Sequence, residues 1–389
     1  MIAPPWLSIP PQGYGGIETV LKGLVDGLVK LGVEVEIFAA GDVELDGCTI
    51  HRIYETEQYP HIHSPWYESL PITIAHIQNA LMTVLNDGNF DIIHDHNGHL
   101  GPFILDWATK LPGMPPSVHT YHGPPFKSGD RSSSLLPDSS LMWDNFDDKS
   151  RSYVVGISNA LMENAPQGIR HKLLEPVYNA VDVEDYRFLD HKKDHFITLA
   201  RFSPDKGQHI AIKYCLEQNA KLRMAGTCAS IATTEELLLE LLNPHSKYRR
   251  NADFRYYSDD ILPATVLHKS IKNVGNISGQ KKRDFIAEAR ALLFPIDWEE
   301  PFGMAVIEAL ASGTPVVAMN RGAMPEIIEH GVTGFLAETE EEFGEYMKHV
   351  GDIDPFICRK SVEDRFSTAT MAQSYLDRYT EVLNRETKL

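Results

Sequence analysis

Cysteine is scarce in this 389-residue sequence, and long apolar runs are missing from it. The cysteines number four and include no CxxC pair, which argues against a zinc site built on thiolates and is typical of a reduced, cytoplasmic protein. No apolar run reaches the roughly 18 residues that indicate a membrane-spanning helix, so we expect no integral membrane segment. The first residues, Met1 to Trp6, have neither the basic stretch nor the apolar stretch of a signal peptide.

Basic residues are also in short supply. The chain has 36 Lys and Arg against 54 Asp and Glu, which gives a formal net charge of −18. Residues 1–130 alone carry 5 basic and 15 acidic residues, a balance of 5 − 15 = −10. Because such a surface repels nucleic acid and anionic lipid headgroups, we expect neither as a partner. An anionic ligand would have to be met by a few well-placed cations.

What the chain does contain is an alternation of strand-like and helix-like segments, which predicts parallel sheets with helices on both faces. In the first half, the strand-like runs are 34–40, 91–96, 117–122 and 153–157. The helix-like segments between them are 17–31, 71–85 and 100–109. The pattern restarts in the second half with strand-like runs at 196–200, 222–225, 291–295 and 315–319.

These two halves predict an α/β protein of two Rossmann-like domains that face a central cleft. Ligands of such sheets bind at the carboxyl ends of the strands, so both sets of loops would line that cleft. We place the first domain at residues 1–177 and the second at 178–369. The last helix, about 370–389, has an apolar stripe that it must bury, and packing back on the first domain would do so. The stripe consists of Met371, Tyr375, Tyr379 and Leu383.

The segment 294–308 carries the strongest signal for a ligand. A turn with Glu300 is expected to follow a strand, and a helix to begin around Phe302. Gly303 would let a ligand approach the first-turn amides of that helix, which suit a phosphate. Glu308 lies on an otherwise apolar helix, where ribose hydroxyls would serve as its partners. The alternative is an ordinary helix N-terminus whose acidic residues favour the dipole.

A second block, residues 200–207, has two cations at a turn between a strand and a helix. Arg201 offers a bidentate fork and Lys206 a point charge, which together suit a diphosphate. A solvated turn is the alternative.

Adjacent glycines, Gly15 and Gly16, stand at another junction between a strand and a helix, in the segment 12–18. Glycines at such a place let backbone N–H groups come close to an anion. The segment lacks the GxGxxG spacing of dinucleotide-binding domains and the GK[ST] ending of a P-loop. It is therefore a weak signal on its own.

Histidines gather at the carboxyl ends of two expected strands. His122 would face the cleft and could hydrogen-bond a ligand hydroxyl, although a structural histidine is the alternative. His94 and His96 lie on one face of their strand and, with His99, suggest a metal site. We prefer a polar strand end near the cleft, and we expect no metal site.

Together these blocks resemble the retaining nucleotide-sugar transferases of glycosyltransferase family 4, which have the GT-B fold. The resemblance covers nearly the whole chain and is most specific between Lys281 and Glu338. The matching segments are ARALLFP at 289–295, EPFGM at 300–304, EALASGTPVVA at 308–318 and GVTGFL at 331–336. Glu300 and Glu308 stand in the family's E-x7-E relation.

The resemblance implies that the first domain binds the acceptor and that the second domain binds the nucleotide-sugar donor. It also implies a role for each matching position of the second domain. Arg201 and Lys206 would be the cations that hold the donor diphosphate. Glu308 would bind the ribose. Glu300 and the backbone amides of Phe302, Gly303 and Met304 would hold the donor sugar.

In the first domain, the resemblance implies that Gly16 meets the phosphate and that His122 stands beside the reacting sugar. Two positions depart from the family. Only three residues precede Pro4 where a longer first strand is usual, so the chain begins inside that strand or the strand is weak. Ala180 replaces a usual Gly and disfavours a left-handed turn at the hinge.

The activity that the resemblance implies is a retaining hexosyl transfer that needs no metal cofactor. The acceptor hydroxyl would attack on the face from which the nucleoside diphosphate leaves, and the leaving phosphate oxygen would take its proton. The expected partners are a UDP-, GDP- or ADP-sugar and a soluble carbohydrate or small-molecule acceptor. The sequence leaves the base, the sugar, the acceptor, the linkage and the oligomeric state open. Rival interpretations are a GT-B sugar-nucleotide epimerase, a phosphorylase and a catalytically silent sugar-binding protein.

Overall fold

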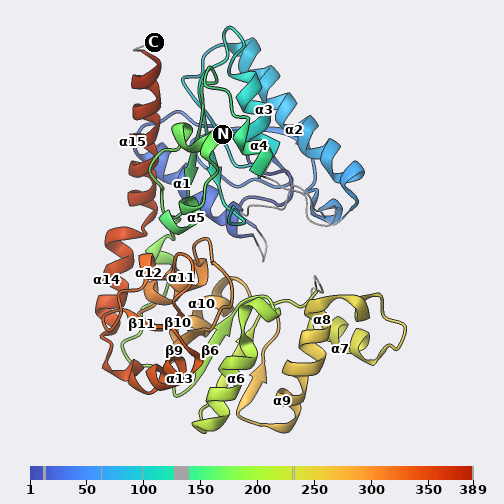
Figure 1. Cartoon of the computed structure of the whole chain (residues 1–389), viewed down its shortest axis with the longest axis vertical. Helices are drawn as coiled ribbons and strands as arrows, with labels where there is room; N and C mark the ends of the chain where they lie inside the picture. The colour runs from blue at the N-terminus through green and yellow to red at the C-terminus, as the bar shows by residue number, and fades with distance from the viewer. Residues whose placement is uncertain are drawn as a thin grey trace. The chain divides into compact units, whose positions relative to one another are not determined.

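The computed structural model describes residues 1–11, 15–62, 64–98, 100–126, 140–229, 231 and 233–387. The chain forms two compact units (Figure 1). Unit 1 comprises Met1–Val181 together with the C-terminal segment Thr368–Leu389, and unit 2 comprises Asp182–Ser367.

Unit 1 is built on parallel strands. They are β1 (Glu36–Ala40), β2 (Thr49–Tyr54), β3 (Ile93–Asp95), β4 (Ser117–Tyr121) and β5 (Ser152–Gly156). The helices are α1 (Gly16–Lys30), α2 (Trp66–Asp87), α3 (Leu100–Ala108), α4 (Ser140–Asp144), α5 (Asn159–Glu163) and α15 (Thr368–Glu386). β1 pairs with β2, while β4 pairs with both β3 and β5.

The first three residues link these two groups of strands. Ile2 forms parallel bridges with Phe38 of β1 and with Asp95 of β3. Phe38 donates its N–H to the carbonyl of Met1 and accepts from the N–H of Ala3. The resulting order is β2, β1, residues 1–3, β3, β4, β5, which is the strand order of a Rossmann fold. The first strand is therefore short but central, and Ile2 is 1% exposed.

Unit 2 contains one parallel sheet in the order β11-β10-β9-β6-β7-β8. Its strands are β6 (Phe196–Leu199), β7 (Leu222–Ala225), β8 (Ile271–Asn273), β9 (Ala291–Phe294), β10 (Val316–Met319) and β11 (Gly334–Ala337). Its helices are α6 (Gln208–Glu217), α7 (Thr234–Leu242), α8 (Ala252–Tyr256), α9 (Leu262–Leu267), α10 (Gly279–Ala287), α11 (Met304–Ala311), α12 (Met324–Ile327), α13 (Glu340–His349) and α14 (Pro355–Arg365).

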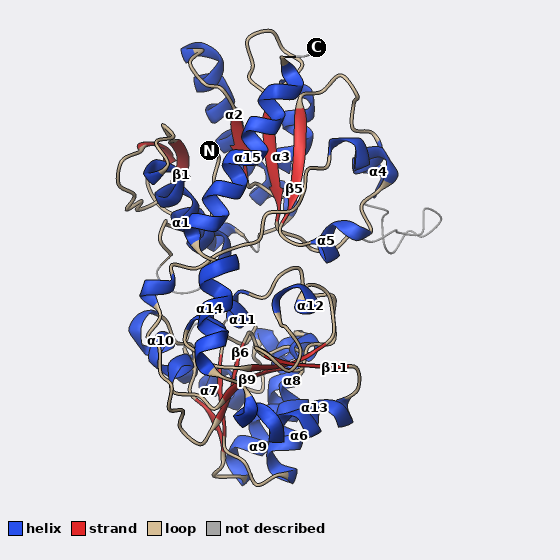
Figure 2. Cartoon of the chain, turned by 90° about the vertical axis from the view of Figure 1, so that its left-hand side faces the viewer, coloured by secondary structure: helices blue, strands red, loops and turns tan. Residues whose placement is uncertain are grey.

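Both predicted Rossmann-like sheets are therefore present, and each has helices packed around its strands (Figure 2). β9 and β10 are buried along their whole length, as expected for strands covered on both faces. In each unit the strand order reverses at one point. This switch point lies between residues 1–3 and β3 in unit 1, and between β6 and β9 in unit 2. Ligands of open α/β sheets bind at such points, beyond the carboxyl ends of the strands.

The last helix, α15, packs against α1 of unit 1. Gly27 of α1 permits the close approach, because a Cβ there would lie 2.6 Å from the Cβ of Ala372. Tyr375 hydrogen-bonds the Thr120 hydroxyl over 2.8 Å, and Tyr379 hydrogen-bonds Nδ1 of His94 over 2.6 Å. The predicted stripe is thus buried at three of its four positions, while Leu383 is only half-buried.

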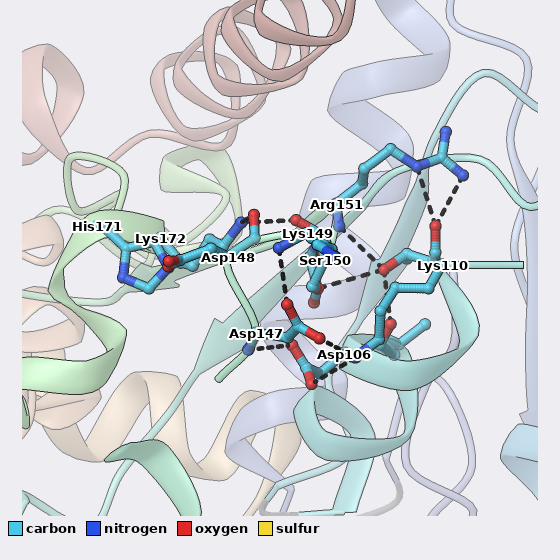
Figure 3. Close-up of polar contacts among 12 residues, drawn as sticks. Asp106, Lys110, Asp147, Asp148, Lys149, Ser150, Arg151, His171 and Lys172 are labelled. Atoms are coloured by element: carbon cyan, nitrogen blue, oxygen red, sulfur yellow. Dashed lines mark hydrogen bonds and ion pairs between the residues drawn. The ribbon is translucent and has the colours of Figure 1, made fainter. Parts of the chain in front are cut away.

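A polar network joins α3 to the segment that precedes β5 (Figure 3). Lys110 contacts Asp147 at 2.9 Å, and Nζ of Lys172 donates to the carbonyls of Asp148 and Ser150. These groups lie at the amino end of β5, the edge opposite to the one where ligands bind. The network therefore stabilises the fold rather than forming part of a site.

Several edge strands were not predicted, namely β2, β8 and β11. Ala180 has a negative φ, as expected for alanine at this position. Among the described non-glycine residues, only Asn219 and Ala229 have a positive φ. No helix in the described part of the chain is long and apolar enough to cross a membrane.

Candidate functional site

The switch point of unit 2 brings two predicted residues into direct contact. Nζ of Lys206, in the turn between β6 and α6, donates to Oε2 of Glu300 over 2.8 Å. The same oxygen accepts from the indole N–H of Trp298 at 3.0 Å, and Nζ lies 4.3 Å from the centroid of the Trp298 ring. Both side chains of the ion pair are mostly buried, at 15% and 13% exposure. The sequence predicted Lys206 and Glu300 but not Trp298.

Two glycines shape the turns at this point. Gly207, with a φ of +66°, stands where a Cβ would lie 1.9 Å from the carbonyl oxygen of Pro295. Gly322, with a φ of +54°, stands where a Cβ would lie 2.4 Å from the backbone nitrogen of Glu300. Only glycine therefore allows the turns that carry Lys206 and Glu300 to pack this closely.

The helix after Glu300 begins two residues later than predicted. α11 starts at Met304, and Gly303 is its N-cap with a φ of +102°. Phe302, expected at the start of the helix, is instead a buried core residue whose ring packs edge-on against Phe366. The first-turn amides of α11, beginning with Met304, stand at the positive end of the helix dipole.

Glu308 lies inside α11 and is 4% exposed. Its Oε1 accepts from Nζ of Lys282 at 2.6 Å and from the hydroxyl of Tyr186 at 3.1 Å. Burial, followed by the charge of Glu308, raises the pKa of Tyr186 well above its usual range, so Tyr186 stays a neutral donor. Among the described residues no donor contacts Oε2, which leaves that oxygen for a ligand hydroxyl. Sequence reasoning missed Lys282 and Tyr186.

Arg201 makes its contact elsewhere. Its Nε lies 3.5 Å from Oδ2 of Asp253, and its side chain is about half exposed. Burial raises the pKa of Asp253, while the charge of Arg201 opposes that rise. The structure thus pairs Lys206 with Glu300 and Arg201 with Asp253, rather than pairing both cations with one group.

In unit 1, the glycine pair lies at the start of α1. A Cβ at Gly15 would lie 2.5 Å from Cβ of Pro11, whereas a Cβ at Gly16 would meet nothing within 4 Å. Gly15 is therefore required by packing, and the Cα of Gly16 faces open space. The three residues before Gly15, positions 12–14, lie outside the described residues.

His122 follows β4 directly, and its Nε2 hydrogen-bonds Nδ1 of His96 over 3.0 Å. Burial, with a smaller effect from His119, lowers the pKa of His122 to about 3. Burial also lowers the pKa of His96 well below its usual value. Both rings are therefore neutral near pH 7 and can exchange hydrogen bonds without carrying charge.

Of the histidines that suggested a metal site, His94 already has protein partners at both ring nitrogens. Nδ1 of His94 contacts the Tyr379 hydroxyl, and its Nε2 contacts the Thr120 hydroxyl at 2.7 Å, so both nitrogens are engaged. His99 lies outside the described residues. Among the residues that are described, no three His, Cys, Asp or Glu side chains are grouped to hold a metal ion.

Two family models match the two halves of the chain. The family model Glycosyltransferase Family 4 matches residues 14–185, and Glycosyl transferases group 1 matches residues 186–353. An uncharacterized glycosyltransferase of Methanocaldococcus jannaschii is 23% identical over 365 residues, which cover 84% of this chain and 82% of that protein.

Solved structures share the fold. Sucrose-phosphate synthase from Thermosynechococcus elongatus has a TM-score of 0.70 at 16% identity, covering 99% of this chain and 98% of that chain. Anabaena HepE, solved with UDP and glucose, has a TM-score of 0.64 at 18% identity, covering 97% and 100%. Two Rossmann-like units of this kind define a GT-B protein. With both family models in succession, the chain is a glycosyltransferase related to family 4.

Proposed function

We propose that this chain is a retaining hexosyltransferase that moves a sugar from a nucleoside-diphosphate sugar to an acceptor hydroxyl without a metal cofactor. The observation that carries the proposal is the contact between Lys206 and Glu300 at the switch point of unit 2, beside the N-terminus of α11. The solved structures of Anabaena HepE with UDP-glucose and with UDP and glucose support a nucleotide-sugar donor for this fold.

The charges of the site suit such a donor. When a diphosphate is bound, the ammonium of Lys206 and the first-turn amides of α11 lie beside its negative charge. Each charge-assisted hydrogen bond of this kind contributes about 1.5–3 kcal/mol. Lys206 then contacts the diphosphate as well as Glu300, and Glu300 accepts hydrogen bonds from hydroxyls of the donor sugar. Oε2 of Glu308 accepts a hydrogen bond from the ribose. Arg201 adds a second cation from the same turn.

In the reaction, the bond between the anomeric carbon and the diphosphate oxygen breaks, and a bond from that carbon to the acceptor oxygen forms on the same face. The acceptor's proton passes to the leaving phosphate oxygen. Lys206 and the helix amides neutralise the departing charge, which is the largest contribution that a protein makes to such a step. These groups do the work that a divalent ion does in other transferases, so no metal is needed.

For unit 1 we propose roles for two residues. The open face of Gly16 suits a phosphate, and the neutral ring of His122 suits a hydroxyl of the reacting sugar. We further propose a soluble carbohydrate or small-molecule acceptor and a cytoplasmic protein, because residues 1–130 carry the −10 balance that repels anionic membranes.

The test is release of free nucleoside diphosphate from UDP-, GDP- and ADP-hexoses, with and without a mixture of mono- and disaccharide acceptors. We expect release that depends on both one donor and one acceptor, and a product whose anomeric coupling constant in the NMR spectrum matches the donor. Acceptor-independent conversion would indicate an epimerase, and phosphate-dependent cleavage of a glycoside would indicate a phosphorylase. A product of the opposite anomeric configuration would overturn retention.

A further inference from the structure

Helix α7, at one side of unit 2, carries more leucine than the fold buries (Figure 1). Its sequence, TEELLLELL, has five leucines in nine residues. Leu237 is 5% exposed and Leu241 is half-buried, so these two face the rest of unit 2. Leu238, Leu239 and Leu242 are instead 48%, 69% and 81% exposed. Apolar side chains that gather on one exposed surface indicate a contact with another molecule.

The exposed leucines share one face of α7 with an acidic residue. Positions 235, 238, 239 and 242 are spaced i, i+3, i+4 and i+7, which places them in one line along a helix. We call this line the α7 stripe (Glu235, Leu238, Leu239 and Leu242). Glu235 stands at its N-terminal end, and the neighbouring Glu236 is also exposed. The stripe is therefore negatively charged at one end and apolar along the rest of its length.

Positive charge lies at the other end of α7. The segment Lys247–Arg250 (KYRR) contributes three exposed cations. Arg249 donates from Nε to the carbonyl of Asn243 and from Nη2 to the carbonyl of Leu241, both over 3.1 Å. These two hydrogen bonds hold the basic segment against the C-terminal end of the helix.

Both ends of this surface are fixed by local contacts. The hydroxyl of Thr233 accepts from the N–H of Glu236 at 3.1 Å and caps the start of α7. In the basic segment, the ring of Tyr248 stacks on the buried ring of Phe254 in α8, with centroids 6.1 Å apart. Because the surface is already ordered, a partner that binds it does not have to immobilise it.

The charges at the two ends remain available to a partner. The two glutamates are exposed, as are Lys247 and Arg250, and within the described residues none of these four side chains forms an ion pair. A second copy of α7 laid antiparallel on the first brings each pair of glutamates to the basic segment of the other copy. The exposed leucines of both copies then meet in the middle. An anionic membrane fits less well, because its headgroups would meet Glu235 on the same face as the leucines.

We propose that this chain forms a two-fold symmetric dimer through the α7 stripe. The contact is isologous: the same surface of each copy supplies the leucines, the acidic end and the basic end. One short helix makes a small interface, so the dimer is weak, with a dissociation constant of roughly 10–100 μM. The stripe includes none of the donor-site residues, so its test does not depend on the proposed function.

The experiment is sedimentation velocity of the full chain from about 1 to about 200 μM, a range that brackets this dissociation constant. The wild-type chain should change from monomer to dimer across that range. Leu239→Glu, which places a charge in the middle of the stripe, should raise the dissociation constant at least about tenfold. Leu111→Glu, the same change at a leucine of unit 1 that is 50% exposed, is the matched control and should leave it unchanged.

The pairing of charges is tested by mixing two variants at low salt. One carries Glu235→Lys and Glu236→Lys, and the other carries Lys247→Glu and Arg250→Glu. Alone, each variant brings like charges together at both ends of the pair and should dimerise at least about fivefold more weakly than wild type. An equimolar mixture should associate about as tightly as wild type, because the mixed dimer pairs opposite charges at both ends.

Four results would overturn the inference. They are a wild-type chain that stays monomeric throughout the range, a dimer that Leu239→Glu leaves intact, an equal loss in Leu111→Glu, and a mixture that associates no more tightly than its separate variants. A monomer that pellets with anionic liposomes would also overturn it and would assign the stripe to a membrane surface.

Discussion

Replacing Glu18 by glutamine should stabilise the protein, by an amount that grows as the pH rises from about 4.5 to about 7 and then levels off. The carboxyl is buried in the folded chain, where its pKa is about 7 against an ordinary value of 4.5. Between these two values the folded state holds a proton that the unfolded state has lost, so the stability of the wild-type chain falls as the pH rises. Glutamine has nearly the same shape and no proton to lose, so the variant escapes this fall.

The size of the effect follows from the pKa difference. A separation of 7 − 4.5 = 2.5 pKa units corresponds to about 3.5 kcal/mol, at roughly 1.4 kcal/mol for each unit. At about pH 5 the wild-type carboxyl is protonated in the folded state and largely ionised in the unfolded state, so only about 1 kcal/mol of this cost is present. Between about pH 5 and about pH 8 the stability difference should grow by about 2.5 kcal/mol in favour of the variant.

The assay is urea denaturation followed by tryptophan fluorescence at both pH values, with the free energy of unfolding extrapolated to zero denaturant. Glu34→Gln serves as the control, because that side chain is exposed. Its difference from wild type should be the same at both pH values. If the difference for Glu18→Gln changes by less than about 0.5 kcal/mol between them, the carboxyl is not buried as described.

Three further predictions concern the donor site and the setting of the enzyme. Lys206→Ala should lower kcat/KM about 30-fold or more, equivalent to about 2 kcal/mol of transition-state stabilisation. The control is Lys213→Ala, which removes an exposed cation on α6 and should have little effect. Activity of Lys206→Ala within about twofold of wild type would contradict the role of Lys206. EDTA should leave the rate of transfer nearly unchanged, whereas activity lost on chelation and restored by one divalent ion would show a metal requirement. Sedimentation with anionic liposomes at low salt, where electrostatic docking is strongest, should leave the chain in the supernatant, and salt-reversible pelleting would show a basic patch that the net charge conceals.

The fold was largely predictable where strands are buried on both faces. β9 and β10 are continuous apolar runs, and their sequences (ALLF and VVAM) allow little else. β2 was missed because its sequence (TIHRIY) has mainly exposed or half-buried positions, and so shows no run of apolar residues. β8 and β11 are short edge strands of the unit 2 sheet, which carry the weakest periodicity.

The residues of the candidate site were predictable by type, but their contacts were not. Glu300 and Lys206 are 94 positions apart, and nothing local in the sequence indicates that they touch. The same holds for Lys282 on α10 and for Tyr186, which are far from Glu308 in the sequence and contact it only in the folded chain. Sheet topology brings these groups together, and topology depends on long-range pairing that a single sequence states only indirectly.

The burial of Glu18 in unit 1 was not predicted from the sequence, for a different reason. Glu18 follows a glycine pair and looks like an ordinary acidic residue in the first turn of a helix, which the dipole favours. Residues of the loops after residues 1–3 and after β3 lie beside it at the start of α1. No short-range pattern reports that burial.

The most direct test of the donor site is calorimetric titration of UDP, GDP and ADP into the wild-type chain and into Glu308→Gln. We propose that the buried carboxyl group of Glu308, whose Oε1 accepts from Lys282, binds the ribose of a nucleotide through Oε2. One of the three nucleotides should bind the wild-type chain, and Glu308→Gln should bind it roughly tenfold more weakly, as expected for a lost charge-assisted hydrogen bond. A wild-type chain that binds none of them, or a variant that binds equally well, would contradict the site described above.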